Sequence, residues 1–248
     1  MITLVDVHKA FGSQPVLRGV SLEVPKGLIT IIIGRSGAGK SVMLKHIIGL
    51  VQPDQGRILV DGVDIAQLRG QAQDALRQRF GVLFQGGALF DSMDVFDNVA
   101  FPLREKTRMG EGEIRDKVLE RLRQVDLLGM ERKFPAELSG GMRKRAALAR
   151  ALIMDPEIVL FDEPTTGLDP ILVTGIHRLI ATMHARFGFT GVVVSHDVPH
   201  VFTIAHRVAM LHQGVITEVG TPEAIQASAD PLVRQFITGA LEGPIRAD

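Results

Sequence analysis

The chain has 248 residues, of which 46% are hydrophobic and 23% are charged. This length and balance are those of an ordinary globular protein with a large core. Its 28 Lys and Arg residues equal its 28 Asp and Glu residues, so no net charge draws it to nucleic acid or to an anionic membrane. It contains no cysteine, which excludes disulfides and thiolate metal sites. We find neither a signal peptide nor an apolar run of ~20 residues, and we expect a soluble chain.

The first strongly apolar segment, LITIII at 28–33, predicts a strand that is covered on both faces, as in a parallel sheet. It leads into GRSGAGKS at 34–41 and then into VMLKHIIGL, which predicts a helix. A G-x-x-x-x-G-K-[ST] pattern between a strand and a helix predicts a loop whose backbone N–H groups bind nucleotide phosphates. In this pattern Lys40 reaches the outer phosphates and the Ser41 hydroxyl binds Mg²⁺. The predicted nucleotide-binding residues are Gly34, Arg35, Ser36, Gly37, Ala38, Gly39, Lys40, Ser41 and Val42.

The next part of the chain is of a different kind. Residues 113–128 predict a helix with apolar side chains on one face and charges on the other. Its apolar face consists of Ile114, Val118, Leu119, Leu122 and Val125. The segment before it, QGGALFDSMDVFDNVAFPL, concentrates large apolar side chains, namely Phe90, Met93, Phe96 and Phe101.

Residues 138–152, LSGGMRKRAALARAL, predict a helix that begins on Ser139, Gly140 and Gly141. Glycine is a poor helix former, so this bare start suggests that another group approaches the backbone closely. Ser139 also suits the role of an N-cap. A cap alone, however, does not explain the two glycines that follow it.

Two further strands end in polar residues. IVLF at 158–161 is followed by Asp162 and Glu163, which fit a ligand site at the carboxyl edge of an open α/β sheet better than a solvated turn. There Asp162 holds Mg²⁺ through a bound water, and Glu163 takes a proton from the attacking water. GVVV at 191–194 precedes His196, and its place at the same sheet edge favours a role at the γ-phosphate.

Over nearly its whole length the chain resembles the nucleotide-binding subunits of ABC transporters. GRSGAGKS resembles the Walker A motif, IVLFDE resembles Walker B, and LSGGM resembles the signature motif. Asp169 lies in a segment similar to the D-loop, Gln85 in one similar to the Q-loop, and His196 resembles the switch histidine. Phe11 lies where the family places an aromatic ring under adenine, although it would serve equally as an ordinary core residue.

The resemblance implies an α/β P-loop NTPase fold of the ABC ATPase type, in which a RecA-like core carries an antiparallel β subdomain and an inserted helical subdomain. We expect a single domain over 1–248, with the core at about 1–85 and 158–220 and the helical subdomain at about 86–157. C-terminal helices and a tail follow at about 221–248. The implied cofactors are ATP and Mg²⁺. The implied catalytic residues are Glu163, His196 and Gln85, and the implied metal-site residues are Ser41, Gln85 and Asp162.

In the family two such chains pair head to tail, and the signature residues Ser139, Gly140 and Gly141 of one chain contact the ATP held by the other. An integral membrane permease is the implied partner, and the ATPase lies as a peripheral subunit on the cytoplasmic face of the inner membrane. The Phe-rich segment near Gln85 and Phe90 is then either the core of the helical subdomain or a groove that receives a short helix of the permease. Both readings can hold, because different residues can do each.

Most of the family has Gln where this chain has Met142. This departure, together with GRSGAGKSVMLKHIIGL, resembles the ATPases that work with MCE proteins, including the Mla system for phospholipid movement between bacterial membranes. Neutral drift at one position is the alternative. The subgroup implies an MCE-type lipid-binding protein as a partner and leaves room for a small cytoplasmic accessory subunit. The competing function is that of the ATPase subunit of a small-solute importer, since its hydrolytic site would be identical.

Overall fold

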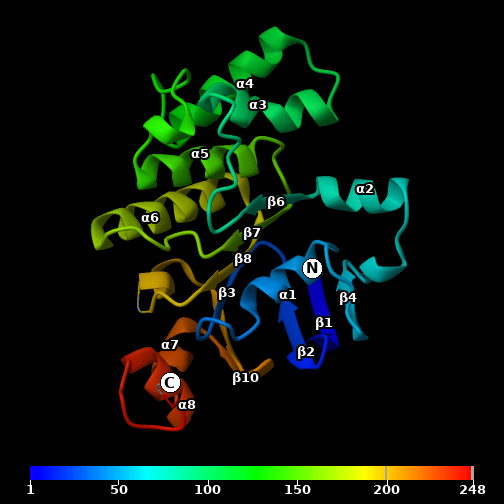
Figure 1. The fold of residues 1–248 in the computed structure, drawn as a ribbon, viewed down its shortest axis with the longest axis vertical. Coiled ribbons are helices and arrows are strands. Elements are labelled where there is room, and N and C mark those ends of the chain that lie inside the picture. The colour runs from blue at the N-terminus through cyan, green and yellow to red at the C-terminus, as the bar shows by residue number, and fades with distance from the viewer. Residues whose placement is uncertain (199, 247–248) are drawn as a thin grey trace. The chain divides into compact units, whose positions relative to one another are not determined.

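The computed structural model describes residues 1–198 and 200–246 (Figure 1). The chain divides into two compact units. Unit 1 consists of residues 1–77 and 190–248, and unit 2 consists of residues 78–189. Helix α2 (Gln71–Gln78) ends at the boundary between them.

Unit 1 contains an antiparallel sheet in the strand order β2-β1-β4-β5. Its strands are β1 (Ile2–Phe11), β2 (Gln14–Val24), β4 (Gln55–Val60) and β5 (Val63–Asp64). Side chains alternate along β2 between exposed and buried positions, as they do when one face of a sheet is covered. The short 3₁₀ helix η1 (Ile65–Gln67) follows β5 and is capped by the Asp64 carboxylate. This sheet matches the antiparallel β subdomain that the sequence resemblance implies.

A second group of strands in unit 1 is built around β3 (Ile29–Ile33), in which every residue is buried. It pairs in parallel with β8 (Thr190–Ser195) on one side and with β9 (Arg207–His212) on the other. The continuous apolar run therefore predicted a doubly covered strand correctly. β10 (Val215–Gly220) adds to β9 in the antiparallel sense. The remaining elements of this unit are α1 (Lys40–Ile47), η3 (His200–Ile204), α7 (Pro222–Gln226) and α8 (Pro231–Thr238).

Unit 2 carries the parallel strands β6 (Phe80–Leu83) and β7 (Ile158–Asp162). Its helices are α3 (Val95–Lys106), α4 (Glu111–Gln124), α5 (Gly140–Leu152) and α6 (Pro170–Phe187), with the 3₁₀ turn η2 (Pro135–Glu137) before α5. Helix α5 packs against α3 and α4 on one side and against α6 on the other, as Figure 1 shows. This central helix is rich in alanine, and four of its alanines are buried.

Two expectations about unit 2 need correction. The helix expected over 113–128 ends at Gln124, because Asp126 adopts a left-handed backbone with φ of 55° that a helix cannot continue through. The large apolar side chains of the segment before it are not fully buried, because Met93, Phe96 and Phe101 are half-buried and Phe90 is exposed. Phe90 is 42% exposed and packs at 4.9 Å against the half-buried ring of Phe101. The fully buried large side chains of α3 and α4 are aliphatic, and they include Val99, Leu103, Ile114, Val118 and Leu122.

The segment after residue 220 forms two short helices and a tail, as predicted. The tail folds back on α8, because the buried Gln235 side chain bonds to both the N–H and the C=O of Ile245. Among the described residues, no helix is both long and apolar enough to cross a membrane.

Candidate nucleotide-binding and hydrolysis site

The loop between β3 and α1 is held closed by its own lysine. The Lys40 ammonium is buried and donates to the carbonyls of Gly34 at 2.7 Å and Arg35 at 3.0 Å. A side chain at Gly34 would place its Cβ 2.2 Å from the Leu211 carbonyl oxygen, so only glycine fits there. Gly39 caps α1 with φ of 101°, a conformation that L residues rarely adopt. The loop therefore presents bare backbone at a helix N-terminus, which is where phosphate binds.

His196 lies beside this loop in unit 1. Ser195, the last residue of β8, pairs in parallel with Ile33, the last residue of β3. His196 and Gly34 therefore leave the same edge of the strand pair, and the His196 side chain is exposed. The sequence predicted this placement of His196 relative to the loop.

Phe11 is not a core residue. It ends β1 with its side chain 51% exposed, and the Lys9 ammonium lies 5.5 Å from the centre of its ring. The alternative reading of Phe11 as ordinary core is thus wrong. An exposed ring of this kind offers a flat apolar face on which a base can stack.

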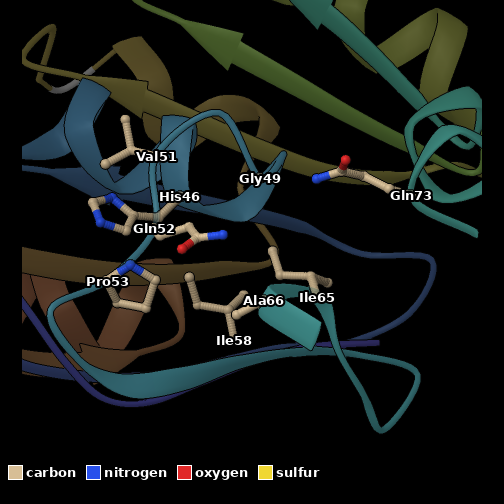
Figure 2. A pocket seen from close by; sticks show the side chains of 9 residues that line it. All are labelled: His46, Gly49, Val51, Gln52, Pro53, Ile58, Ile65, Ala66 and Gln73. Carbon is tan, nitrogen blue, oxygen red and sulfur yellow. The ribbon is translucent and has the colours of Figure 1, made fainter. Parts of the chain in front are cut away.

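The loop also contacts the C-terminal tail. The Arg35 guanidinium donates to the Arg246 carbonyl at 2.7 Å. A small pocket lies elsewhere in unit 1, beside the buried His46 and lined also by Ile58 and Ile65 (Figure 2). Its volume of about 10 Å³ suits a single water molecule, so it is not a nucleotide site.

In unit 2, the carboxylate pair stands at the end of β7 as predicted. Asp162 is the last residue of the strand and Glu163 follows it in a left-handed conformation with φ of 50°. Glu163 is buried, and the Thr166 hydroxyl donates to its Oε2 at 2.9 Å. A buried carboxylate whose lone pairs are oriented by a neighbour is suited to accept a proton from a fixed direction.

The start of α5 shows why its backbone is bare. The Ser139 hydroxyl accepts a hydrogen bond from the Met142 N–H at 3.2 Å, so Ser139 is the N-cap of the helix. Added Cβ atoms at Gly140 and Gly141 would lie 3.2 Å from the side chains of Leu168 and Leu172 respectively. The glycines therefore allow the helix to pack closely on the following segment, a reason within the chain that the sequence did not reveal.

Asp169 has a structural function as well as its predicted place in the D-loop. Its carboxylate accepts from the N–H groups of Ile171 and Leu172, both at 3.0 Å, and so caps α6. Pro170 follows at the first position of that helix, where its missing N–H costs nothing. The D-loop segment is thereby fixed to the start of a long helix.

Two basic residues of α5 that the sequence did not single out hold the segment around Gln85. The buried Lys144 ammonium donates to the Gln85 carbonyl and lies 3.5 Å from the Glu163 carbonyl. Burial lowers the pKa of Lys144, and the carboxylates of Asp162 and Glu163 act against that shift. Arg150 donates to the Gly87 carbonyl at 2.8 Å. Gln85 itself is exposed, so its backbone is fixed while its side chain faces outward.

The chemistry of the predicted metal-site residues suits a magnesium ion that is bound mainly by a nucleotide. Among the described residues, no group of three or more His, Asp or Glu side chains is placed to hold a metal. Mg²⁺ does not need such a cage, because it binds through one or two protein oxygens together with substrate phosphates and water. The Ser41 hydroxyl of unit 1 and the Asp162 carboxylate of unit 2 are each, by their chemistry, an oxygen ligand of this kind.

The chain carries a glycine-rich loop between β3 and α1, two carboxylates at the end of β7 and a helix, α5, that begins on two glycines. The family model described as ABC transporter matches residues 17–166. The chain therefore belongs to the ABC transporter family, as its ATP-binding subunit, and it binds and hydrolyses ATP.

Known proteins agree with this assignment. The chain is 47% identical to the "Probable ribonucleotide transport ATP-binding protein mkl" of Mycobacterium leprae, over 98% of this chain and 70% of that protein. It is 43% identical to the "Intermembrane phospholipid transport system ATP-binding protein MlaF" of Escherichia coli, over 99% of this chain and 91% of that protein. The solved ATP-binding cassette MJ0796, a dimer in a post-hydrolysis state with ADP and Pi, has a TM-score of 0.82 at 32% identity. The alignment covers 90% of this chain and 99% of that one.

Proposed function

We propose that this chain hydrolyses ATP to power phospholipid transport between bacterial membranes. The observation that carries the proposal is the match to MlaF, which extends over 99% of this chain and 91% of that protein. The match to mkl leaves almost a third of that relative uncovered. The name of mkl, "Probable ribonucleotide transport ATP-binding protein", keeps a small-solute transporter as the second candidate.

The proposed roles of the site residues follow from their chemistry. The loop Gly34–Val42 binds the phosphates of ATP, with Lys40 on the outer phosphates and Phe11 stacking under adenine. Glu163 acts as the general base for the attacking water, while Gln85 and His196 orient the water and the γ-phosphate. Ser41, Gln85 and Asp162 hold Mg²⁺, with Asp162 acting through a water, and the ion would neutralise phosphate charge.

We also propose the division of labour along the chain. Residues 86–157, which include α3, α4 and α5, work as the helical subdomain, and residues 1–85 with 158–220 work as the core. The exposed Phe90 near Gln85 belongs to the surface that a short helix of the membrane permease contacts. An MCE-type lipid-binding protein and a small cytoplasmic accessory subunit complete the complex, with this chain on the cytoplasmic face of the inner membrane.

The base assignment is tested by Glu163→Gln. This variant keeps the shape of the side chain but cannot accept the proton, so turnover should fall about 10²- to 10⁴-fold while ATP binding persists. Lys40→Ala should instead weaken ATP binding, because it removes a phosphate contact. Phosphate release and nucleotide affinity of the purified transporter measure both effects. A normal hydrolysis rate with Glu163→Gln would show that another group is the base.

The transported substrate is tested by deleting the gene. Loss of phospholipid transport should change the lipid composition of the outer membrane and raise the sensitivity of the cells to detergent. A Glu163→Gln copy should fail to restore the wild-type state, while the wild-type copy restores it. Unchanged lipids, together with lost uptake of a water-soluble nutrient, would move the assignment to the small-solute transporter.

A further inference from the structure

Helix α5 buries a lysine that none of the roles above uses. Lys144 lies one turn after the signature glycines, and its side chain is buried. Its ammonium donates to the Gln85 carbonyl, 59 positions away in the sequence, and is 3.5 Å from the Glu163 carbonyl. A buried ammonium is costly unless acceptors surround it. These two carbonyls are the acceptors that the structure provides for it.

Both acceptors belong to segments that leave parallel strands at the same edge. Leu83, the last residue of β6, pairs with Phe161 of β7, and Gln85 and Glu163 each follow two residues later. The side chains of these two residues are the ones proposed to orient and deprotonate the attacking water. The direction of each side chain depends on how its own backbone is held.

The backbone at Glu163 needs such support. A non-glycine residue with φ of 50° is uncommon and persists only where its surroundings fix it. The Glu163 carbonyl also accepts from the Thr166 N–H at 3.3 Å, and Lys144 supplies the contact from a different element. Arg150, further along the same helix, holds the next turn through the Gly87 carbonyl. Helix α5 thus fixes the backbone of both catalytic segments.

We propose that Lys144 is a positioning residue for ATP hydrolysis, whose ammonium ties the backbones of Gln85 and Glu163 to the signature helix. This inference rests on the proposed roles of Gln85 and Glu163. It adds that a single side chain fixes the backbone from which both catalytic side chains extend. Movement of the signature helix is therefore transmitted directly to Gln85 and Glu163. Lys144 itself does not touch the reacting atoms.

The test compares two substitutions with a matched control in the full-length chain, purified with its membrane subunits. Lys144→Met keeps most of the apolar stem of the side chain and removes every donor. Lys144→Gln keeps an amide donor group on a shorter side chain. Lys117→Met is the control, because Lys117 is a lysine of unit 2 whose 2.7 Å partner is Asp155, away from both catalytic segments. The measurements are kcat, KM for ATP and the melting temperature.

Lys144→Met should lower kcat about 10- to 100-fold, since a misplacement of about 1 Å has effects of this size. KM should stay near the wild-type value, because the phosphate-binding loop is unchanged. The loss of kcat should be larger than any change in the melting temperature explains. The kcat of Lys144→Gln should lie between those of Lys144→Met and the wild type. The kcat of Lys117→Met should equal that of the wild type. This split between kcat and KM is not what a general loss of packing produces.

Three results would overturn the proposal. They are a wild-type kcat with Lys144→Met, an equal loss with Lys117→Met, or a loss of kcat that follows the melting temperature across the variants. If Lys144→Met does not fold, a wild-type kcat with Lys144→Gln would also overturn the proposal. Glu163→Gln is measured in parallel. An inactive Glu163→Gln beside an active Lys144→Met rejects the positioning role alone, whereas an active Glu163→Gln rejects the proposed base.

Discussion

At the scale of single residues, the Glu163 carboxylate is oriented by a hydroxyl from the same loop. Thr166→Val removes the 2.9 Å hydrogen bond to Oε2 while keeping the shape of the side chain. A hydrogen bond to a charged group contributes about 1.5–3 kcal/mol, so we expect kcat to fall about tenfold or more with ATP affinity unchanged. Steady-state hydrolysis and nucleotide binding by the purified protein measure this.

The matched control for this prediction is Thr174→Val. The Thr174 hydroxyl donates to the Pro170 carbonyl of its own helix at 3.1 Å, and the residue is exposed. Its loss should leave kcat at the wild-type value. Equal rates for the two valine variants would show that the Thr166 hydroxyl does not orient the base.

At the scale of elements, helix α1 carries a histidine that makes folding sensitive to acid. His46 is fully buried, and its Nδ1–H donates to the Val42 carbonyl at 2.7 Å. Burial lowers the pKa of His46, the nearby Lys9 lowers it further, and the Val42 carbonyl and Asp54 act against the shift. The unfolded chain therefore binds this proton more readily than the folded one. The stability that neutral His46 contributes is present above the unfolded pKa of ~6.5 and is lost as pH falls below it.

We accordingly expect the melting temperature to fall between pH 7.5 and pH 5.5, and to fall less in His46→Gln than in wild type. Scanning calorimetry or fluorescence melts at both pH values would measure the difference. His8→Gln serves as the control, because His8 belongs to the same unit but its side chain is 37% exposed. The same pH dependence in wild type and in His46→Gln would contradict this account.

An element could be predicted from the sequence where residues next to one another in the chain determine it. The strand Ile29–Ile33 and the loop after it follow from a continuous apolar run and a fixed spacing of glycines, lysine and serine, so both were predicted. The end of α4 at Gln124 was missed, because Asp126 has no glycine or proline to mark the break. The buried face of α4 was predicted, since Ile114, Val118 and Leu122 are all in the core. The exposure of Phe90 was not predicted. Large aromatic side chains in a sequence favour the prediction of a core, yet Phe90 lies at the surface.

The residues of the candidate site also fall into those that a local motif predicts and those that only the fold brings together. Lys40, Glu163 and Ser139 belong to linear motifs, and each was identified from its neighbours in the chain. Lys144 touches segments that are 59 and 19 positions away, so only the fold brings it to them. The packing of Gly140 on Leu168 is of the same kind. Such contacts depend on how α5 lies against β6 and α6, which no local pattern specifies.

At the scale of the whole molecule, the question is whether one chain makes a complete site. The solved cassette MJ0796, which is similar to this chain, is a dimer. If two chains pair head to tail, Ser139 of one contacts the γ-phosphate held by the other. Ser139→Asp separates this role from the N-cap, because Asp caps helices as well as Ser does and its charge suits a helix N-terminus. The variant should fold normally but lose hydrolysis, since its carboxylate would repel the phosphate.

The dimer is then tested by mixing two inactive chains that carry different affinity tags. A Lys40→Ala chain keeps an intact signature, and a Ser139→Asp chain keeps an intact phosphate-binding loop. In a mixed head-to-tail dimer the loop of the second chain meets the signature of the first, so one composite site is intact. Complexes purified through both tags should therefore hydrolyse ATP faster than either variant alone. The control pairs a Lys40→Ala chain with a chain that carries both Lys40→Ala and Glu163→Gln. Neither chain of this pair has an intact phosphate-binding loop, so no composite site is restored. If verified mixed complexes stay as inactive as this control, each site is complete within one chain, and if Ser139→Asp alone is active, Ser139 serves only as a cap.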